Sequence, residues 1–333
     1  MGVKDPTKPL DLAQVRYTSL KQKKHKVGST LFARTWKKGG TLTDFLDSLP
    51  MMLAGKELRE VAERIAEAVQ RKSMVLLGMG AHPIKVGLNP IIIDWMEQGV
   101  LKGIGMNGAG LIHDVELAMV GHTSEDVDEE LSKGTFGMVR ETHETINRAI
   151  QEGSEEGLGI GEVVGQKILE GDFPFEHLSL LAAGRRLGIP ITVHVAIGTD
   201  ITHMGPSADG AAIGKGSLKD FRTFVSLVTR LEKGVFINLG SAVILPEVFL
   251  KAFALASNLG HPPVNLTTVN MDFTYHYRPT LNVTKRPTLK GGKGYTLIGH
   301  HEVMFPLLAA AVLEKLRGSR SQGFKGSSKK LGT

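Results

Sequence analysis

Short apolar runs that end in glycine-rich turns alternate along the chain with longer segments of helical periodicity. The apolar runs cover residues 74–77, 103–106, 191–195 and 235–238. A short apolar run bounded by glycine is typical of a buried strand. Apolar residues recur at the spacing of one helix face in four further segments, 57–71, 135–152, 218–231 and 246–258. This alternation predicts an α/β fold, a Rossmann-like doubly wound parallel sheet with helices on both faces.

Glycine accounts for 40 of the 333 residues, well above the roughly 7% of an average protein. Glycines lie in each of the turns that follow the four apolar runs. In doubly wound folds ligands bind at the carboxyl ends of the strands, and glycine there lets the backbone approach a nucleotide. Each turn taken alone is equally well explained as a tight connection. The ordinary G-x-G-x-x-G fingerprint and the P-loop are both excluded, because neither pattern occurs in its required context.

Polar residues gather on the same turns. His82 follows the first apolar run, and His113 and Asp114 lie just beyond the glycine-rich turn of residues 107–110. Because both side chains can exchange protons, His113 with Asp114 is the best candidate for a general acid/base pair. Further histidines and acids follow the third run and precede the last helical segment, namely His194, Asp200, His203, Asp209, His300 and His301.

Two kinds of chemistry remain open for these residues. Imidazoles and carboxylates at strand ends are common ligands of hydrolytic metals, so one interpretation is a metal site built on His194, Asp200 and His203. Their spacing matches no helix-face ligand pair such as H-E-x-x-H. In the other interpretation Asp and His accept hydrogen bonds from ribose or an amine, and a desolvated lysine acts as nucleophile. The lysine candidates are Lys285, Lys290 and Lys293, for which a basic surface loop is the alternative.

Residues 272–286 gather two tyrosines, one histidine and two arginines. A long loop of aromatic and cationic side chains either forms a lid over an anionic ligand or packs against a neighbouring subunit. The sequence leaves both interpretations open.

The formal charge of +6 comes from the ends of the chain. Residues 1–40 hold ten Lys/Arg and two acids, residues 315–333 hold six Lys/Arg and no acid, and residues 41–314 are net acidic. We therefore expect a basic N-terminal arm, a single α/β domain over 41–314 and a disordered basic tail. Aromatic residues are sparse in both ends, which argues against nucleic-acid binding. The absence of cysteine and of a long apolar segment predicts a cytoplasmic protein without a membrane span.

Four collinear stretches resemble the deoxyhypusine synthase family. They are residues 75–121, 188–204, 234–258 and 301–314, which lie within a span of about 240 residues. The first resembles the family's nucleotide turn and the glycine turn that follows it, and the second its strand that ends in Thr-Asp. The third resembles its later glycine turn, and the last its final helix. The resemblance implies a Rossmann-like sheet that holds NAD near a subunit interface, a small-molecule substrate, and a homotetramer.

The resemblance also implies which residues contact NAD. Residues 81–85, with Ala81 and His82, fall on the family's first cofactor loop, and Asp200 falls on the aspartate that meets the cofactor. The other residues placed in this way are Gly80, Asn107, Gly108, Ala109, Gly110, Gly240, Ser241, Asn270, His300 and His301.

The family's catalytic residues are matched less well. Its acidic pair after the glycine turn is Ile112 and His113 here, followed by Asp114, and its substrate histidine is replaced by Pro246 or Glu247. The context of its nucleophilic lysine is absent, and Lys285 is the nearest replacement.

Cationic side chains mark the same region, namely Arg278, Lys285 and Arg286, and they favour an anionic or neutral substrate. We therefore expect an NAD-dependent transferase or oxidoreductase that acts on a small molecule. The alternatives are a true deoxyhypusine or homospermidine synthase that uses spermidine with Lys285 as nucleophile, a metal-dependent hydrolase, and a non-catalytic ligand-binding scaffold.

Overall fold

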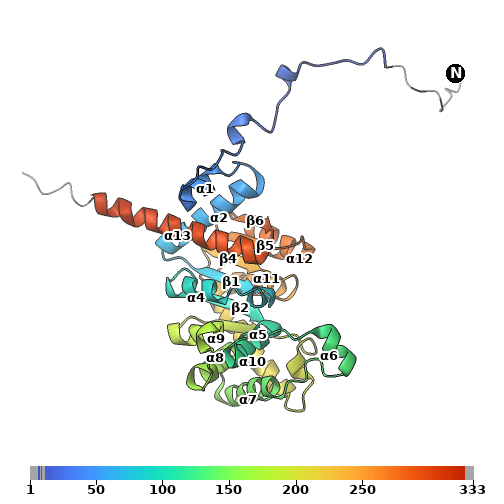
Figure 1. The fold of residues 1–333 in the computed structure, drawn as a ribbon, viewed down its shortest axis with the longest axis vertical. Helices are drawn as coiled ribbons and strands as arrows, with labels where there is room; N and C mark the ends of the chain where they lie inside the picture. Colours follow the sequence, from blue (N-terminus) through green and yellow to red (C-terminus); the bar gives the residue numbers. More distant parts are fainter. Residues whose placement is uncertain (1–6, 8, 10–11, 327–333) are drawn as a thin grey trace, which may run out of the picture.

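Six parallel strands form the centre of the molecule, in the order β3-β2-β1-β4-β5-β6 (Figure 1). The structure, a computed structural model, describes residues 7, 9 and 12–326. The chain lays down β1, β2 and β3 in one direction, returns to the other side of β1 with β4, and continues to β5 and β6. This doubly wound order confirms the predicted fold class and places a reversal of strand order between β1 and β4.

The first four strands begin within one residue of the predicted positions. The strands are β1 Val75–Met79, β2 Gly103–Asn107, β3 Ile191–His194, β4 Val235–Leu239, β5 Thr267–Asp272 and β6 Lys293–Ile298. Every residue of β1 and β4 is buried. Strands that are covered on both faces read as nearly continuous apolar runs, which is why the sequence pattern located them.

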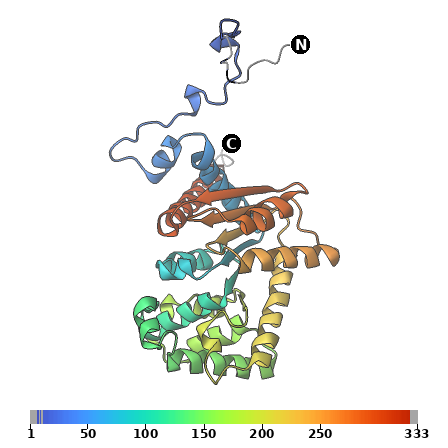
Figure 2. The same cartoon turned by 90° about the vertical axis from the view of Figure 1, so that its right-hand side faces the viewer.

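Helices cover both faces of the sheet (Figures 1 and 2). Alternate side chains of β1 show the division, because Val75 and Leu77 join one core cluster and Leu76 joins the other. The first cluster includes residues of α2 Leu53–Gln70, α4 Asn89–Glu97, α5 Gly108–Val120 and α13 His301–Gly326. The second includes residues of α10 Gly210–Val228 and α11 Ile244–Asn258. In it, Phe236 stacks on Phe249 with ring centroids 3.7 Å apart.

A helical segment follows β2 and forms part of the lower end of the molecule in Figure 1. After α5 it consists of α6 Val127–Lys133, α7 Arg140–Glu156, α8 Ile160–Glu170 and α9 Leu180–Leu187. The predicted helix over 135–152 begins later than expected, because Gly134 and Gly137 have positive φ and interrupt the chain there. The helix predicted over 218–231 begins earlier, because Asp209 caps α10 by accepting hydrogen bonds from the amides of Ala211 and Ala212.

The segment 272–286 is not the predicted long loop. It contains α12 Tyr277–Pro279 and the π-helical turn η5 Thr280–Lys285, in which Asn282 and Val283 are buried. The turn η5 packs against β5 and β6, so that part of the segment belongs to the body. The lid interpretation stays a prediction for residues 273–277, whose aromatic side chains are exposed.

The two ends of the chain differ from the expected boundaries. The N-terminal arm extends away from the body (Figure 2), but from Leu31 onward it bonds to the loop around α1 Leu42–Ser48. The amide of Met51 donates to the Leu31 carbonyl at 2.9 Å, and the amide of Arg34 donates to the Ser48 carbonyl at 2.8 Å. The predicted disordered tail is helical as far as Gly326, and its residues 327–333 lie outside the described residues. No helix in the described part of the chain is long and apolar enough to cross a membrane.

Candidate functional site

The segments that leave β1 and β4 lie against each other at the reversal of strand order. The amide of Gly80 donates to the carbonyl of Leu239 at 3.1 Å. A β-carbon on Gly80 would collide with the carbonyl oxygen of Gly240, so only glycine permits this approach. Gly240 has φ of +63°, in the left-handed region that favours glycine. In doubly wound folds the ligand crevice opens at such a reversal.

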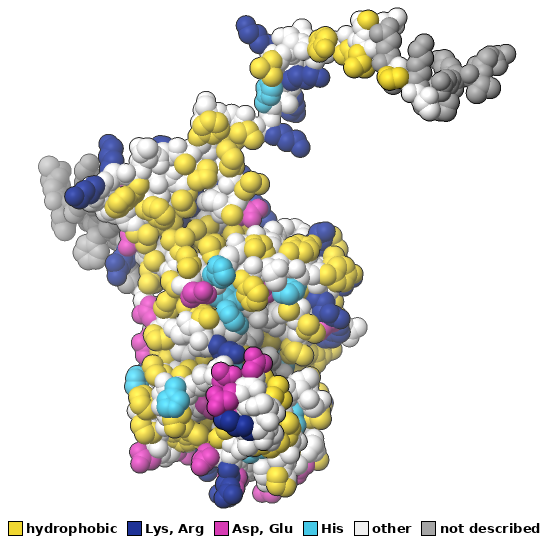
Figure 3. Space-filling model, turned by 45° about the vertical axis from the view of Figure 1, so that its right-hand side comes forward, with side chains coloured by type: hydrophobic (Ala, Val, Ile, Leu, Met, Phe, Trp, Pro, Cys, Tyr) yellow, Lys and Arg dark blue, Asp and Glu magenta, His cyan; other side chains and the backbone are white. Residues whose placement is uncertain are grey.

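Two histidines meet at this reversal. Nδ1 of His82, the first residue of α3 His82–Lys85, lies 2.8 Å from Nδ1 of His301, the first residue of α13. One of these two nitrogens must carry a proton for the hydrogen bond to form. The pKa of His301 is lowered by burial, while the buried Asp272, 3.9 Å from its Nε2, opposes that shift. The Phe273 ring packs beside both imidazoles. Figure 3 shows histidine side chains gathered near the middle of one face of the molecule.

A second group of predicted residues meets at the ends of β2 and β3. Asn107 caps α5, because its side-chain oxygen accepts a hydrogen bond from the amide of Gly110 at 3.0 Å. The carboxylate of Asp200 lies over the same helix start, where a β-carbon on Gly108 would collide with it. Burial raises the pKa of Asp200, and the neighbouring His203 opposes that shift. Asp200 therefore occupies the helix N-terminus at which an anionic phosphate would otherwise be favoured.

Contacts within the chain explain the glycines of these turns. Gly80 faces the Gly240 carbonyl, Gly240 faces the His301 ring, and Gly108 faces Asp200. The interpretation of each as a tight connection is supported at these positions. Direct approach of a ligand to these glycines stays a prediction.

The remaining predicted cofactor residues lie in or just after the strands, and their side chains are buried to different extents. Ser241 accepts a hydrogen bond from the amide of Leu245 at the start of α11. Asn270 accepts one from the side chain of Asn238 at 2.8 Å, and its own buried Nδ2 has no hydrogen-bond partner among the described residues. The side chain of His300 is 78% exposed.

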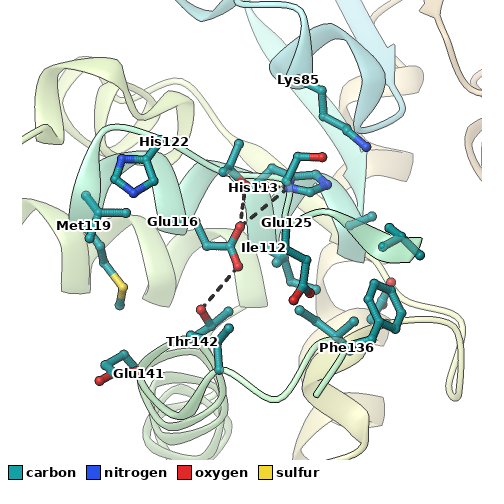
Figure 4. A pocket seen from close by; sticks show the side chains of 18 of the residues that line it. Lys85, Ile112, His113, Glu116, Met119, His122, Glu125, Phe136, Glu141 and Thr142 are labelled. Carbon is teal, nitrogen blue, oxygen red and sulfur yellow. Dashed lines mark hydrogen bonds and ion pairs between the residues drawn. The ribbon is translucent and has the colours of Figure 1, made fainter. Parts of the chain in front are cut away.

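A cavity of about 620 Å³ adjoins the start of α5 (Figure 4). Ala109 and Asp200 line it, so it lies directly beside the β2 and β3 ends. Its apolar lining is Ile112, Met119, Val120, Val127, Phe136, Val139 and Ile201. Its charged lining is four carboxylates and one lysine, namely Glu116, Glu125, Glu141, Asp200 and Lys85. The charge that faces the cavity is therefore acidic.

His113 lines this cavity within a hydrogen-bonded group. Its Nδ1 lies 2.7 Å from the hydroxyl of Thr123, which in turn donates to Glu116. The hydroxyl of Thr142 donates to the other oxygen of Glu116 at 3.3 Å. Burial opposes ionisation of Glu116, but hydrogen bonds with His113 and Thr123 outweigh it and lower the pKa of this carboxyl.

Asp114 does not face His113. Its side chain is fully buried and caps α9, where it accepts hydrogen bonds from the Ser179 hydroxyl at 2.6 Å and from the amides of Leu180 and Leu181. Burial raises the pKa of Asp114 to about 6, against the lowering effect of these hydrogen bonds. The predicted acid/base pair is thus not formed by the structure, because successive residues of a helix point about 100° apart.

Lys285 lies near the amino ends of the strands, whereas the crevice is at their carboxyl ends. The carbonyl of Thr284 packs against Gly294, the second residue of β6, so the turn η5 ends near the amino ends of the strands. Two neighbouring cations are also engaged locally, since Arg278 pairs with Glu247 at 3.2 Å and Arg286 donates to Asn282 at 2.6 Å. The expectation of an anionic or neutral substrate drew on these residues, none of which lines the cavity.

Lys290 and Lys293 are the two other lysine candidates. Lys293 is on β6, where it pairs with Glu60, and Lys290 is exposed.

Two residues of the alternative metal site lie near each other, since Nε2 of His203 is 4.0 Å from the carboxylate of Asp200, whereas His194 has other partners. His194 is buried against Phe224, its Nε2 lies 3.0 Å from the Thr192 hydroxyl, and burial lowers its pKa to about 3. His203 accepts hydrogen bonds from the amides of Gly198 and Asp200, so it stabilises its own loop. Among the described residues no group of three or more His, Cys, Asp or Glu is arranged to hold a metal ion.

Sequence reasoning missed Glu116, Thr123 and Thr142. Glu116 follows His113 by three residues, a spacing that places both on one helix face, and this signal was available. Thr142 comes from α7, and its proximity to Glu116 depends on how α5 and α7 pack.

No protein-family model matches the sequence, and no curated relative was found. Solved structures match at the level of the fold. A protein assigned as a deoxyhypusine synthase from Entamoeba histolytica has a TM-score of 0.53 at 12% identity, over 85% of this chain and 96% of that one. A protein assigned to the LOR/SDH group from Methanococcus maripaludis S2 has a TM-score of 0.51 at 17% identity, over 84% and 75%.

A variant of AgrE bound to L-arginine is also similar, with a TM-score of 0.52 at 14% identity over 78% of this chain. The present chain spans only about a third of that longer protein, 32% of its length. These likenesses show the fold alone. The resemblance seen in the sequence is thus supported as a relation of fold with a protein assigned as a deoxyhypusine synthase.

Proposed function

We propose that this protein binds NAD across the carboxyl ends of the strands and acts on a small molecule in the adjoining cavity. The observation that carries the proposal is the reversal of strand order between β1 and β4. Predicted cofactor residues from three distant segments come into contact at that reversal, namely Gly80 and His82, Gly240, and His301. Parallel α/β sheets bind their ligands at such a reversal of strand order.

The side chains at this edge fit a dinucleotide as hydrogen-bonding partners. Asp200 is a carboxylate acceptor of the kind that binds ribose hydroxyls in related folds. Asn270 offers a buried donor that is not satisfied within the described chain. Because Asp200 covers the start of α5, the pyrophosphate would lie toward His82 and Ser241. A bound NAD would supply hydride transfer, and the residues named here would bind and orient it.

The cavity beside the crevice would hold the substrate. Its apolar walls would bury a hydrocarbon body, and its carboxylates favour a neutral or cationic group over an anionic one. The proposal therefore keeps the neutral substrate of the earlier expectation and replaces the anionic one with a cationic one. The homotetramer and the transferase or oxidoreductase class remain part of the proposal, supported by the sequence resemblance.

Isothermal titration calorimetry with NAD tests the proposal. The expected result is saturable binding of one NAD per chain, weakened at least tenfold by Asp200→Ala, the equivalent of about 1.4 kcal/mol. Asp209→Ala is the matched control, since this aspartate caps α10 instead. The absence of binding heat at millimolar NAD in the folded wild-type protein would reject the proposal.

A further inference from the structure

The cavity beside α5 contains a hydrogen-bonded series of three side chains that the predicted acid/base pair did not include. His113 and Glu116 come from one face of α5, and Thr123 from the loop that follows it. The side chains of His113 and Glu116 are 17% and 16% exposed, so both are largely withdrawn from water while lining the cavity. Figure 4 shows His113 and Glu116 side by side on the cavity wall.

The number of protons that each group can donate fixes the direction of each hydrogen bond. An ionised carboxylate only accepts, and a threonine hydroxyl has a single proton to donate. The lowered pKa of Glu116 keeps it ionised at neutral pH, so the Thr123 proton points to Glu116. The Thr123 oxygen is then an acceptor toward His113. Nδ1 of His113, 2.7 Å away, must therefore carry the proton of the neutral ring, and Nε2 carries the lone pair.

We propose that Thr123 and Glu116 are a positioning pair that holds His113 as the proton acceptor of this cavity. The proposal rests on the proposed function, because it assigns a base to the substrate site. In the step, a substrate X–H group gives its proton to Nε2, which leaves X with the electron pair and His113 as an imidazolium. Thr123 then keeps accepting from Nδ1–H, and the Glu116 carboxylate, 3.7 Å from Nδ1, balances the new positive charge.

The side chains around His113 in the cavity are mostly acidic. The other titratable groups that line the cavity are Lys85, His122, Glu125, Glu141 and Asp200. Carboxylates outnumber the lysine among them. The second oxygen of Glu116 accepts a hydrogen bond from the Thr142 hydroxyl, 3.3 Å away.

Nitrogen-15 NMR of the imidazole rings tests the assignment, with His113→Gln used to identify the His113 signals. In the neutral ring of the wild-type protein Nδ1 is expected to have the pyrrole-like shift and Nε2 the pyridine-like shift. Thr123→Val, which keeps the side-chain shape, should lose this preference, and Thr123→Ser should restore it. Thr142→Val is the matched control, because it removes a bond to Glu116 that does not pass through Thr123. A ring protonated on Nε2 in the wild type, or an unchanged tautomer in Thr123→Val, would overturn the proposal.

Diethyl pyrocarbonate tests whether Nε2 is accessible, because the reagent acylates the unprotonated nitrogen of neutral imidazole. Peptide mass spectrometry should show modification of His113 in the wild type and in Thr142→Val. A His113 that stays unmodified while exposed histidines such as His300 react would contradict its role as the acceptor. Both experiments are performed without NAD, so a protein that fails to bind NAD can still confirm the tautomer, and the two failures are distinguishable.

Discussion

At the scale of single residues, the neighbours His113 and Asp114 of α5 have different roles. His113 faces the cavity, while Asp114 faces away and caps α9. A buried carboxylate with several donors stabilises the fold only while all of them are paired. The sequence pattern H-D suggested a proton-exchanging pair, whereas the helix geometry separates the two residues.

Asp114→Ala is expected to destabilise the protein by about 3 kcal/mol or more, because the Ser179 hydroxyl and the amides of Leu180 and Leu181 lose their buried acceptor. Urea unfolding followed by circular dichroism measures the change. Asp128→Ala, an exposed aspartate on α6, is the control and should change stability by no more than about 0.5 kcal/mol. A small effect at Asp114 would show that the cap is not needed.

His194 should make stability depend on pH. Its folded pKa of about 3 is below the ordinary value of 6.5, so between these values the unfolded chain binds more protons than the folded one. The contribution is complete above pH 6.5 and is lost as the pH falls toward 3, by an amount on the order of 4 kcal/mol. The difference in unfolding free energy between wild type and His194→Gln should therefore shrink on acidification. A constant difference at all pH values would contradict a buried neutral ring at His194.

At the scale of elements, α5 connects the crevice and the cavity. Its first turn meets Asp200, and its later turns carry His113 and Glu116 into the cavity wall. Gly108, the first residue of this helix, lies so close to Asp200 that an added methyl group would collide with the carboxylate.

Gly108→Ala should displace Asp200 and cost about 1–3 kcal/mol, because the added β-carbon collides with that carboxylate. Gly214→Ala is the matched control within α10, where a β-carbon meets no atom within 4 Å. It should be neutral or raise stability by up to about 1 kcal/mol, since alanine favours helix. Thermal unfolding of both variants provides the measurement, and equal behaviour would refute the contact between Gly108 and Asp200.

The sequence predicted the elements whose signal is local. The buried strands β1 and β4 read as apolar runs, but β5 and β6 were missed because threonine and asparagine interrupt the first and lysine and glycine begin the second. The segment after β5 read as a loop because Pro279 and its polar residues obscure the helical turns. Thr142 could not be placed beside Glu116, since that contact depends on the packing of two helices.

At the scale of the whole molecule, the N-terminal arm extends away from the folded body (Figure 2). Its apolar side chains Tyr17 and Leu20 are 91% and 74% exposed. Large exposed apolar side chains on an extended segment are typical of a surface that another chain covers. We propose that in the homo-oligomer the arm lies on a neighbouring copy.

Removal of residues 1–28 should leave a folded body but a smaller assembly, because the bonds from Leu31 and Arg34 to the α1 region are kept. Size-exclusion chromatography with light scattering measures the mass of both forms. As a control, replacing the lysines at 21, 23 and 24 by glutamine keeps the apolar side chains and should preserve the assembly. An unchanged mass after truncation would contradict a role of the arm in association.

The central claim is that NAD binds across the carboxyl ends of the strands, where the strand order reverses. Hydrogen–deuterium exchange with and without NAD measures this most directly. The account predicts that NAD slows exchange in the turns at residues 80–83, 107–111 and 240–243, and leaves the amino ends of the same strands unchanged. Slowed exchange at the amino ends alone, around Lys285 and Gly294, or no change anywhere at saturating NAD, would contradict it.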